Sequence, residues 1–126
     1  MTLEYEWIQH NDTEYPATRG EPIADERVQD GLRVWNPYES KLAAVLVKGY
    51  EDFVSLDSDT KVLYLGAAAG TTPSYVADIC KVVYAVEFAT TPASRLIEVA
   101  EEKDGLMPVV EDARKPERYT SIVEKV

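Results

Sequence analysis

The pattern of hydrophobic and polar residues divides the chain into two parts of different character. Residues 1–35 hold short, weakly alternating stretches between turn-forming residues, as in LEYEWI (3–8), HNDTEYP (10–16) and RGEP (19–22), and show no helical periodicity. Short alternating segments separated by Gly, Pro, Asn and Asp are typical of strands joined by turns. The pattern therefore predicts a small N-terminal β-hairpin region.

A helix is predicted where this region ends. Asn36 is a favourable N-cap, Pro37 suits the first helical position, and Glu39 stands where the acid of a capping box lies. Apolar residues then recur at helical spacing until Gly49, a natural stop.

After an acidic connector, strands and helices alternate. The apolar runs KVLYL (61–65), VVYAVEF (82–88) and LMPVV (106–110) predict three buried strands, and the segments 72–80 and 92–105 between them have helical spacing. Strands that alternate with helices form parallel sheets with right-handed crossovers. We therefore expect an α/β fold after the β region.

Length and composition fit one domain, made of a β region over residues 1–35 and an α/β part over residues 36–126. No apolar run approaches the roughly 18 residues that a membrane helix needs. The N-terminus has neither the basic nor the apolar segment of a secretory signal. Cys80 is the only cysteine, so an internal disulfide is impossible, which favours a reducing, cytoplasmic setting.

The charge balance changes the picture of possible partners. Twenty-three acidic residues against 13 basic ones give a net charge of −10, and no basic stripe is present. Because phosphate contacts dominate affinity for nucleic acids, this balance argues against a free-standing nucleic-acid binder. Scattered acidic residues favour a solvated acidic surface. Adaptation to high salt, which screens the repulsion between such charges, is one specific interpretation of that surface.

The candidate chemistry begins at the loop GAAAG after the first of the three strands. Gly66 and Gly70, with Ala67 among the small residues between them, allow tight turns and the close approach of a ligand. Thr71 and Thr72 then offer hydroxyl groups at the start of a helix.

Two acids extend this pattern. Glu87 lies at the end of the second strand, 21 residues after Gly66, where a carboxylate can accept hydrogen bonds from ribose hydroxyls. Asp112 follows the third strand, where it can accept from an adenine amino group. The loop is not G-x-G-x-x-G, and no lysine follows Gly70 as in a phosphate-binding loop. A nucleoside pocket for S-adenosylmethionine is favoured over a dinucleotide site.

Several segments resemble the archaeal fibrillarin-like proteins. They are WNPYESKLAA (35–44), VLYLGAAAGTTPSYVADI (62–79), YAVEFA (84–89) and EDARKPERY (111–119), and ATRGEPI (17–23) is similar to that family's N-terminal β region. The resemblance implies a Rossmann-like, S-adenosylmethionine-dependent methyltransferase fold. It also implies 2′-O-methylation of ribosomal and transfer RNA within a box C/D guide ribonucleoprotein. The implied partners are guide RNA, target RNA, a Nop-domain scaffold protein and a kink-turn-binding protein.

The resemblance further implies roles for single residues. The expected cofactor-binding residues are Gly66, Ala67, Gly70, Thr71, Thr72, Glu87, Phe88, Asp112 and Ala113. The two threonines would contact the methionine part of the cofactor, the glutamate and phenylalanine its ribose and adenine, and the last two residues the adenine edge. Lys41 matches a lysine of the family's catalytic Lys-Asp-Lys-His set.

The chain also departs from the family pattern. Glu39 stands where the family usually has arginine, and YTSIVEKV (119–126) stops where the family enters its fourth strand. The family's catalytic aspartate, second lysine and histidine lie beyond that point. We therefore expect a fold truncated after about three strands. A non-catalytic cofactor- or scaffold-binding remnant stays an alternative, as does a general small-molecule methyltransferase or nucleotide-binding domain.

Overall fold

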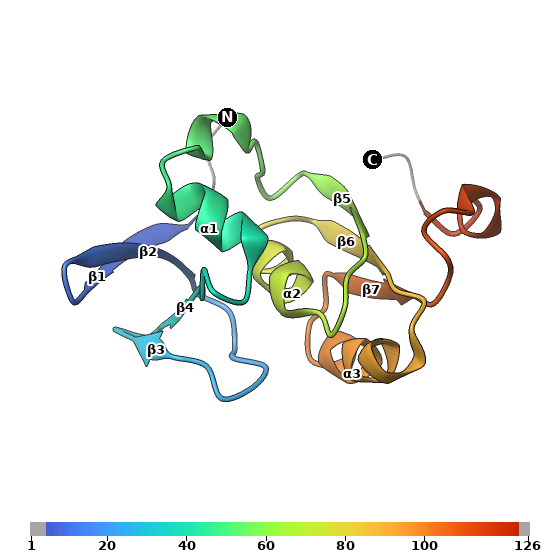
Figure 1. The fold of residues 1–126 in the computed structure, drawn as a ribbon, viewed down its shortest axis with the longest axis horizontal. Helices are drawn as coiled ribbons and strands as arrows, with labels where there is room; N and C mark the ends of the chain where they lie inside the picture. The colour runs from blue at the N-terminus through green and yellow to red at the C-terminus, as the bar shows by residue number, and fades with distance from the viewer. Residues whose placement is uncertain (1–4, 124–126) are drawn as a thin grey trace.

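The computed structural model describes residues 5–123, which form two sheets with helices between them (Figure 1). The elements in chain order are β1 (Glu6–His10), β2 (Thr13–Thr18), β3 (Val28–Gln29), β4 (Leu32–Val34), α1 (Lys41–Val47), the 3₁₀ turn η1 (Glu51–Phe53), β5 (Lys61–Leu65), α2 (Thr71–Ala77), β6 (Val82–Val86), α3 (Thr90–Glu101), β7 (Leu106–Val109) and the 3₁₀ turn η2 (Pro116–Arg118). Helix α1 packs on β2 and on α2, and α2 packs on β6. These two helices therefore join the two sheets.

The N-terminal sheet is antiparallel, with strand order β1-β2-β4-β3. Strands β1 and β2 form a hairpin in which His10 pairs with Thr13, and both turn residues, Asn11 and Asp12, have positive φ angles of 50° and 66°. A two-residue turn with both φ angles positive matches the right-handed twist of its strands. The expected β region is therefore present, and with four strands it is larger than a hairpin. Its small core consists of Ile8, Ala17, Leu32 and Val34.

Helix α1 begins later than the sequence pattern predicted. Its N-cap is Ser40, whose Oγ accepts a hydrogen bond from the backbone N–H of Ala43 at 3.2 Å. Asn36 instead heads a turn: its side-chain oxygen accepts from Tyr38 N at 2.9 Å, and its carbonyl accepts from Ser40 N at 2.9 Å. Asn and Ser are both good N-caps, so local preference alone does not decide between a turn and a helix start.

The second sheet is parallel, with strand order β5-β6-β7, and confirms the expected α/β architecture. Val62 pairs with Val83, which pairs with Leu106. Residues from α2 and α3 share one core with alternate residues of these strands, so both crossover helices cover the same face. Helix α3 has 12 residues, and none of the helices within residues 5–123 is long and apolar enough to cross a membrane.

The other face of the parallel sheet is covered unevenly. Over β6 and β7, the segment after β7 folds back, and Tyr119 packs with Tyr84, Val86 and Val109. This cover does not extend over the end of β5: Leu65 is 52% exposed, whereas its pairing partner Val86 on β6 is fully buried. Among the described residues, no strand pairs with the outer edge of β5.

A buried group of charges fastens the N-terminal sheet to the rest of the molecule. Arg33 on β4 is fully buried, donates from Nε and Nη2 to the two carboxylate oxygens of Glu26 at 2.8 Å each, and donates from Nη1 to Asp78 at 3.0 Å. Lys103, after α3, donates to the other oxygen of Asp78 at 2.9 Å. Burial lowers the pKa of Arg33, but the hydrogen bonds to Glu26 and the charge of Asp78 outweigh it, so that pKa lies above its ordinary value.

Candidate functional site

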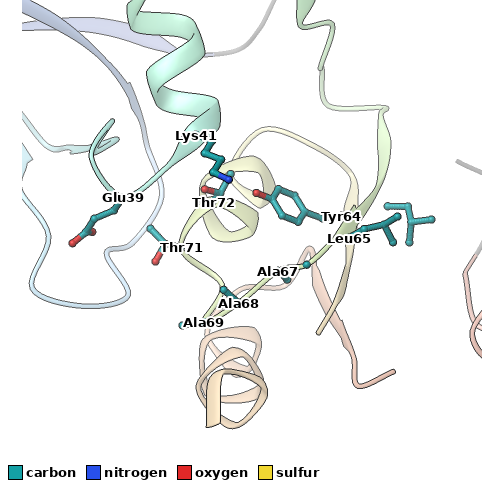
Figure 2. A pocket seen from close by; sticks show the side chains of 11 residues that line it. Glu39, Lys41, Tyr64, Leu65, Ala67, Ala68, Ala69, Thr71 and Thr72 are labelled. Carbon is teal, nitrogen blue, oxygen red and sulfur yellow. The ribbon is translucent and has the colours of Figure 1, made fainter. Parts of the chain in front are cut away.

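A cleft of about 620 Å³ opens where the start of α1 faces the end of β5 (Figure 2). It is lined by Glu39 and Lys41, by residues 63–69, and by the first two residues of α2. The volume lies within the roughly 300–1,000 Å³ typical of small-molecule sites. The carboxyl end of a parallel strand, followed by a loop and a helix, is also where open α/β sheets bind their ligands.

The loop that forms one wall has three residues with positive φ angles: Gly66 at 78°, Ala68 at 51° and Gly70 at 96°. The two glycines have different surroundings. A Cβ built on Gly66 would meet no atom within 4 Å, whereas one on Gly70 would lie 2.9 Å from Cδ1 of Leu96 on α3. The backbone at Gly66 is therefore open to a ligand, and Gly70 lets the loop pack closely against α3.

Glu87 holds this loop in place. Its Oε1 accepts from the backbone N–H of Ala68 at 2.7 Å, and its Oε2 accepts from Phe88 N at 3.1 Å and Ala89 N at 3.0 Å, at the start of α3. A carboxylate offers about four acceptor positions. Three are filled by backbone amides, so Glu87 retains room for about one further donor.

Asp112 is bound by a neighbour two residues away. Its Oδ1 accepts from the backbone N and Nε of Arg114, both at 3.0 Å, and its Oδ2 accepts from Nη2 at 2.8 Å. These hydrogen bonds hold the pKa of the Asp112 carboxyl well below its usual range. The Asp112 side chain is 10% exposed and that of Arg114 84%. An adenine amino group at this carboxylate would therefore compete with an exposed guanidinium.

The two threonines at the start of α2 differ in environment. Thr72 is 6% exposed, and its hydroxyl donates to Oγ of Ser40 at 2.8 Å. Thr71 is half-buried, and within residues 5–123 its hydroxyl has no hydrogen-bond partner. Both line the cleft, but only Thr71 has an uncommitted hydroxyl.

Lys41 is the cation of the cleft. It is the first residue of α1, is exposed, and forms no ion pair with any of the described residues. Figure 2 shows its amine pointing into the cleft toward the hydroxyl of Tyr64, while the carboxylate of Glu39 points the other way. Tyr64 and Glu39 were not predicted as site residues. The alternation of β5 could have indicated Tyr64, since it places this side chain on the helix-covered face.

The structure thus brings part of the predicted set into the cleft. The residues that line it are Lys41, Gly66, Ala67, Thr71 and Thr72. The predicted residues outside its lining are Gly70, Glu87, Phe88, Asp112 and Ala113. Phe88 is 61% exposed, and Ala113 packs in the cluster under Tyr119, whose hydroxyl donates to the Ala113 carbonyl at 2.8 Å.

Comparison with known proteins agrees on one family. A sequence model of the fibrillarin family matches residues 10–126. A fibrillarin-like rRNA/tRNA 2′-O-methyltransferase of Halorubrum lacusprofundi is 50% identical over 108 residues, which are 86% of this chain and 50% of that protein. The protein of the same description from Methanocaldococcus jannaschii is 43% identical over 114 residues, 86% of this chain and 49% of its own length. The chain spans about half the length of the curated relatives it matches.

Solved structures agree with the sequence comparison. The fibrillarin of a fibrillarin/Nop5p complex superposes with a TM-score of 0.82 at 41% identity, covering 95% of this chain and 57% of that one. The fibrillarin of Aeropyrum pernix, crystallised with natively bound S-adenosyl-L-methionine, gives 0.80 at 32% identity, covering 99% and 64%. These likenesses confirm the fold expected from the sequence.

Proposed function

The chain belongs to the fibrillarin family, and on this premise we propose that its cleft binds S-adenosylmethionine. The residues present fit this cofactor. The open backbone at Gly66 allows close approach, and the free hydroxyl of Thr71 offers a donor. Glu87, which accepts from the lining residue Ala68, keeps about one acceptor position for a ribose hydroxyl. When bound, the cofactor supplies an activated methyl group.

The proposed reaction is 2′-O-methylation of ribose in ribosomal and transfer RNA. The contribution of this chain is to hold the donor beside the loop and to place the Lys41 amine where a ribose hydroxyl or phosphate arrives. Much of the rate of such a transfer comes from aligning the two reactants. The chain matches about half of each relative, and we propose the activity for an assembly in which the matched and the unmatched halves are both present.

The net charge of −10 also fits a guided enzyme. A protein that selected RNA by itself would need many phosphate contacts from Lys and Arg. We propose that guide RNA selects the nucleotide to be methylated. A Nop-domain scaffold protein and a kink-turn-binding protein would hold the guide, and the assembly would work in the cytoplasm. The solved fibrillarin/Nop5p complex, in which a related protein is bound to Nop5p, supports the scaffold protein as a partner.

A pair of glycine variants tests the cofactor proposal. Gly66 and Gly31 share a φ of 78°, and neither has any atom within 4 Å of an added Cβ. Gly66→Ala and Gly31→Ala therefore carry the same backbone strain, about 1 kcal/mol each. In calorimetric titration with S-adenosylmethionine, we expect Gly66→Ala to bind at least about tenfold more weakly and Gly31→Ala to bind like the parent chain. Equal affinities in the two variants, or a preference of the parent for NAD, would overturn the assignment.

Methyl transfer separates the enzymatic proposal from the alternative of a non-catalytic binding role. The assay uses a guide-directed RNA and tritiated cofactor, with and without the half of the Halorubrum lacusprofundi relative that this chain does not match. We expect transfer only with both polypeptides. Transfer by the 126 residues alone would contradict the need for a second half, and cofactor binding without transfer in any combination would support the binding role.

A further inference from the structure

One buried contact joins the two walls of the cleft. The Thr72 hydroxyl, at the start of α2, donates to Ser40 Oγ at 2.8 Å, and the same oxygen accepts from Ala43 N at 3.2 Å as the N-cap of α1. Ser40 is 1% exposed and Thr72 is 6% exposed. The contact is therefore shielded from water. In such a buried place a hydrogen bond is stronger, and the loss of one partner costs more, than at the surface.

This contact lies between the cofactor loop and the cleft's cation. Thr72 follows the loop directly, and Ser40 directly precedes Lys41. Helix α1 is also anchored by Ala43, in its first turn, and by Leu46, in its second, which are both buried in the main core. Ser40 adds the hydrogen bonds at the N-terminal end of the first turn, directly before Lys41.

A hydroxyl group has a single proton to donate. Thr72 gives that proton to Ser40, whereas the hydroxyl of Thr71 has no partner within residues 5–123. We propose that Thr72 and Ser40 are positioning residues, which fix Lys41 relative to the loop, and that Thr71 alone of the two threonines donates to the cofactor. The inference rests on the proposed function for the identity of the cofactor, but the position of Lys41 can be measured without it.

The first experiment compares the same substitution at two neighbouring positions. Valine has the shape of threonine without the hydroxyl, so Thr71→Val and Thr72→Val are matched variants. In titration with S-adenosylmethionine, we expect Thr71→Val to lose about tenfold in affinity, which corresponds to about 1.4 kcal/mol, and Thr72→Val to remain within threefold of the parent. The reverse order, or an equal loss, would make Thr72 a cofactor ligand and overturn the proposal.

The second experiment observes Lys41 in the protein without cofactor. Carbon–proton NMR spectra of protein with ¹³C-labelled lysine resolve the side-chain methylenes, and Lys41→Arg identifies the Lys41 signal. We expect Thr72→Val and Ser40→Ala to shift this signal from its position in the parent spectrum, because the Lys41 side chain would no longer keep one place beside Tyr64. The signal of Lys48, exposed at the other end of α1, should stay in place, and Thr72→Ser should restore the parent spectrum. An unmoved Lys41 signal in both variants would refute the positioning role.

The two readouts separate the possible failures. If the parent chain binds no S-adenosylmethionine but the Lys41 signal moves as expected, the proposed function fails and the positioning role stands. In the assembled enzyme, the positioning role predicts that Thr72→Val lowers kcat by about tenfold with little change in KM for the cofactor, and that Thr72→Ser recovers kcat. A loss confined to KM would contradict it.

Discussion

Charged side chains are treated in opposite ways at the junction of the two sheets and in the cleft. At the junction, Arg33 is fully buried, and Glu26 and Asp78 occupy its guanidinium on two sides. In the cleft, Lys41 is exposed and has no ion-pair partner among residues 5–123. A buried charge is tolerated only when it is paired and hydrogen-bonded. The junction charges are therefore part of the fold, and the charge in the cleft is available to a ligand.

The hydrogen bonds of Asp78 show that the buried polar groups of the junction all have partners. Its carboxylate accepts from Thr18 Oγ1 at 2.6 Å as well as from Arg33 and Lys103. Across the described residues, no buried side-chain nitrogen or oxygen lacks a hydrogen-bond partner. The contrast gives a rule for this chain: removing a junction charge should cost stability, and removing a cleft charge should cost function.

Arg33→Met tests the junction and should have the largest effect. It leaves the carboxylate of Glu26 without its buried partner and removes one of the two cations paired with Asp78, which costs about 3–5 kcal/mol of unfolding free energy. Urea unfolding followed by circular dichroism measures the loss, and a variant already unfolded without urea meets the expectation. The control is Arg19→Met, because the Arg19–Glu6 pair spans 3.3 Å with side chains 82% and 53% exposed, so its loss should cost about 0–1 kcal/mol. Similar losses in both variants would contradict the contrast.

Glu87→Gln tests a charge that is intermediate between the buried junction charges and the exposed charge of the cleft. The Glu87 side chain is half-buried, and its hydrogen-bond donors are all backbone amides. An amide side chain has one oxygen, so it cannot accept from Ala68 on one side and from Phe88 and Ala89 on the other. We expect a loss of about 1–3 kcal/mol in stability and faster hydrogen exchange at the Ala68 amide.

The matched control for Glu87→Gln is Glu98→Gln on α3. Glu98 is 67% exposed and pairs with Arg95 three residues away, so its substitution should cost no more than about 0.5 kcal/mol. If the exchange rate at Ala68 is unchanged in Glu87→Gln, the carboxylate does not hold the loop.

The parallel sheet could be predicted from the sequence because its signals are local. The apolar run at 61–65 coincides with β5, and the run at 82–88 contains β6, which ends at Val86. The start of α1 was predicted too early, because Asn36 and Ser40 are equally suited to cap a helix and only tertiary contacts decide. Thr72 is such a contact, 32 residues from Ser40.

The junction charges could not be predicted from the sequence. Arg33 and Asp78 are 45 residues apart, and nothing in the pattern around either residue indicates the other. The proximity of the loop and the acid after β6 could be predicted because the order of strands fixes where they lie. The pairing of Asp112 with Arg114 was missed, although a spacing of two residues is short enough for a local ion pair. Their roles in binding the cofactor stay predictions.

Acid titration of Asp112 should have a smaller effect. The pKa of Asp112 is lowered in the folded chain by its hydrogen bonds from Arg114, so the pair stabilises the fold above the unfolded pKa of about 3.9. That contribution is lost as the pH falls below about 4 toward the folded pKa. The stability of the parent chain should therefore fall more steeply in this range than that of Asp112→Asn.

Salt provides the control for this titration, because the guanidinium of Arg114 is exposed and its charge is screened by ions. The difference between the parent chain and Asp112→Asn should shrink in molar KCl. Identical acid profiles for the two proteins at low salt would show that the pair contributes nothing to the fold.

Lys41→Met should have the smallest effect on stability and completes the contrast with Arg33. A cation in the first turn of a helix faces the positive end of the helix dipole, and methionine has a helix propensity close to that of lysine. The free energy of unfolding should therefore stay within about 0.5 kcal/mol of the parent value or rise slightly, while methyl transfer by the assembled enzyme is lost. Since Lys41 has no ion-pair partner among residues 5–123, no described ion pair is broken in the variant. A loss of more than about 1 kcal/mol would mean that Lys41 belongs to the fold, like Arg33, and not to the site.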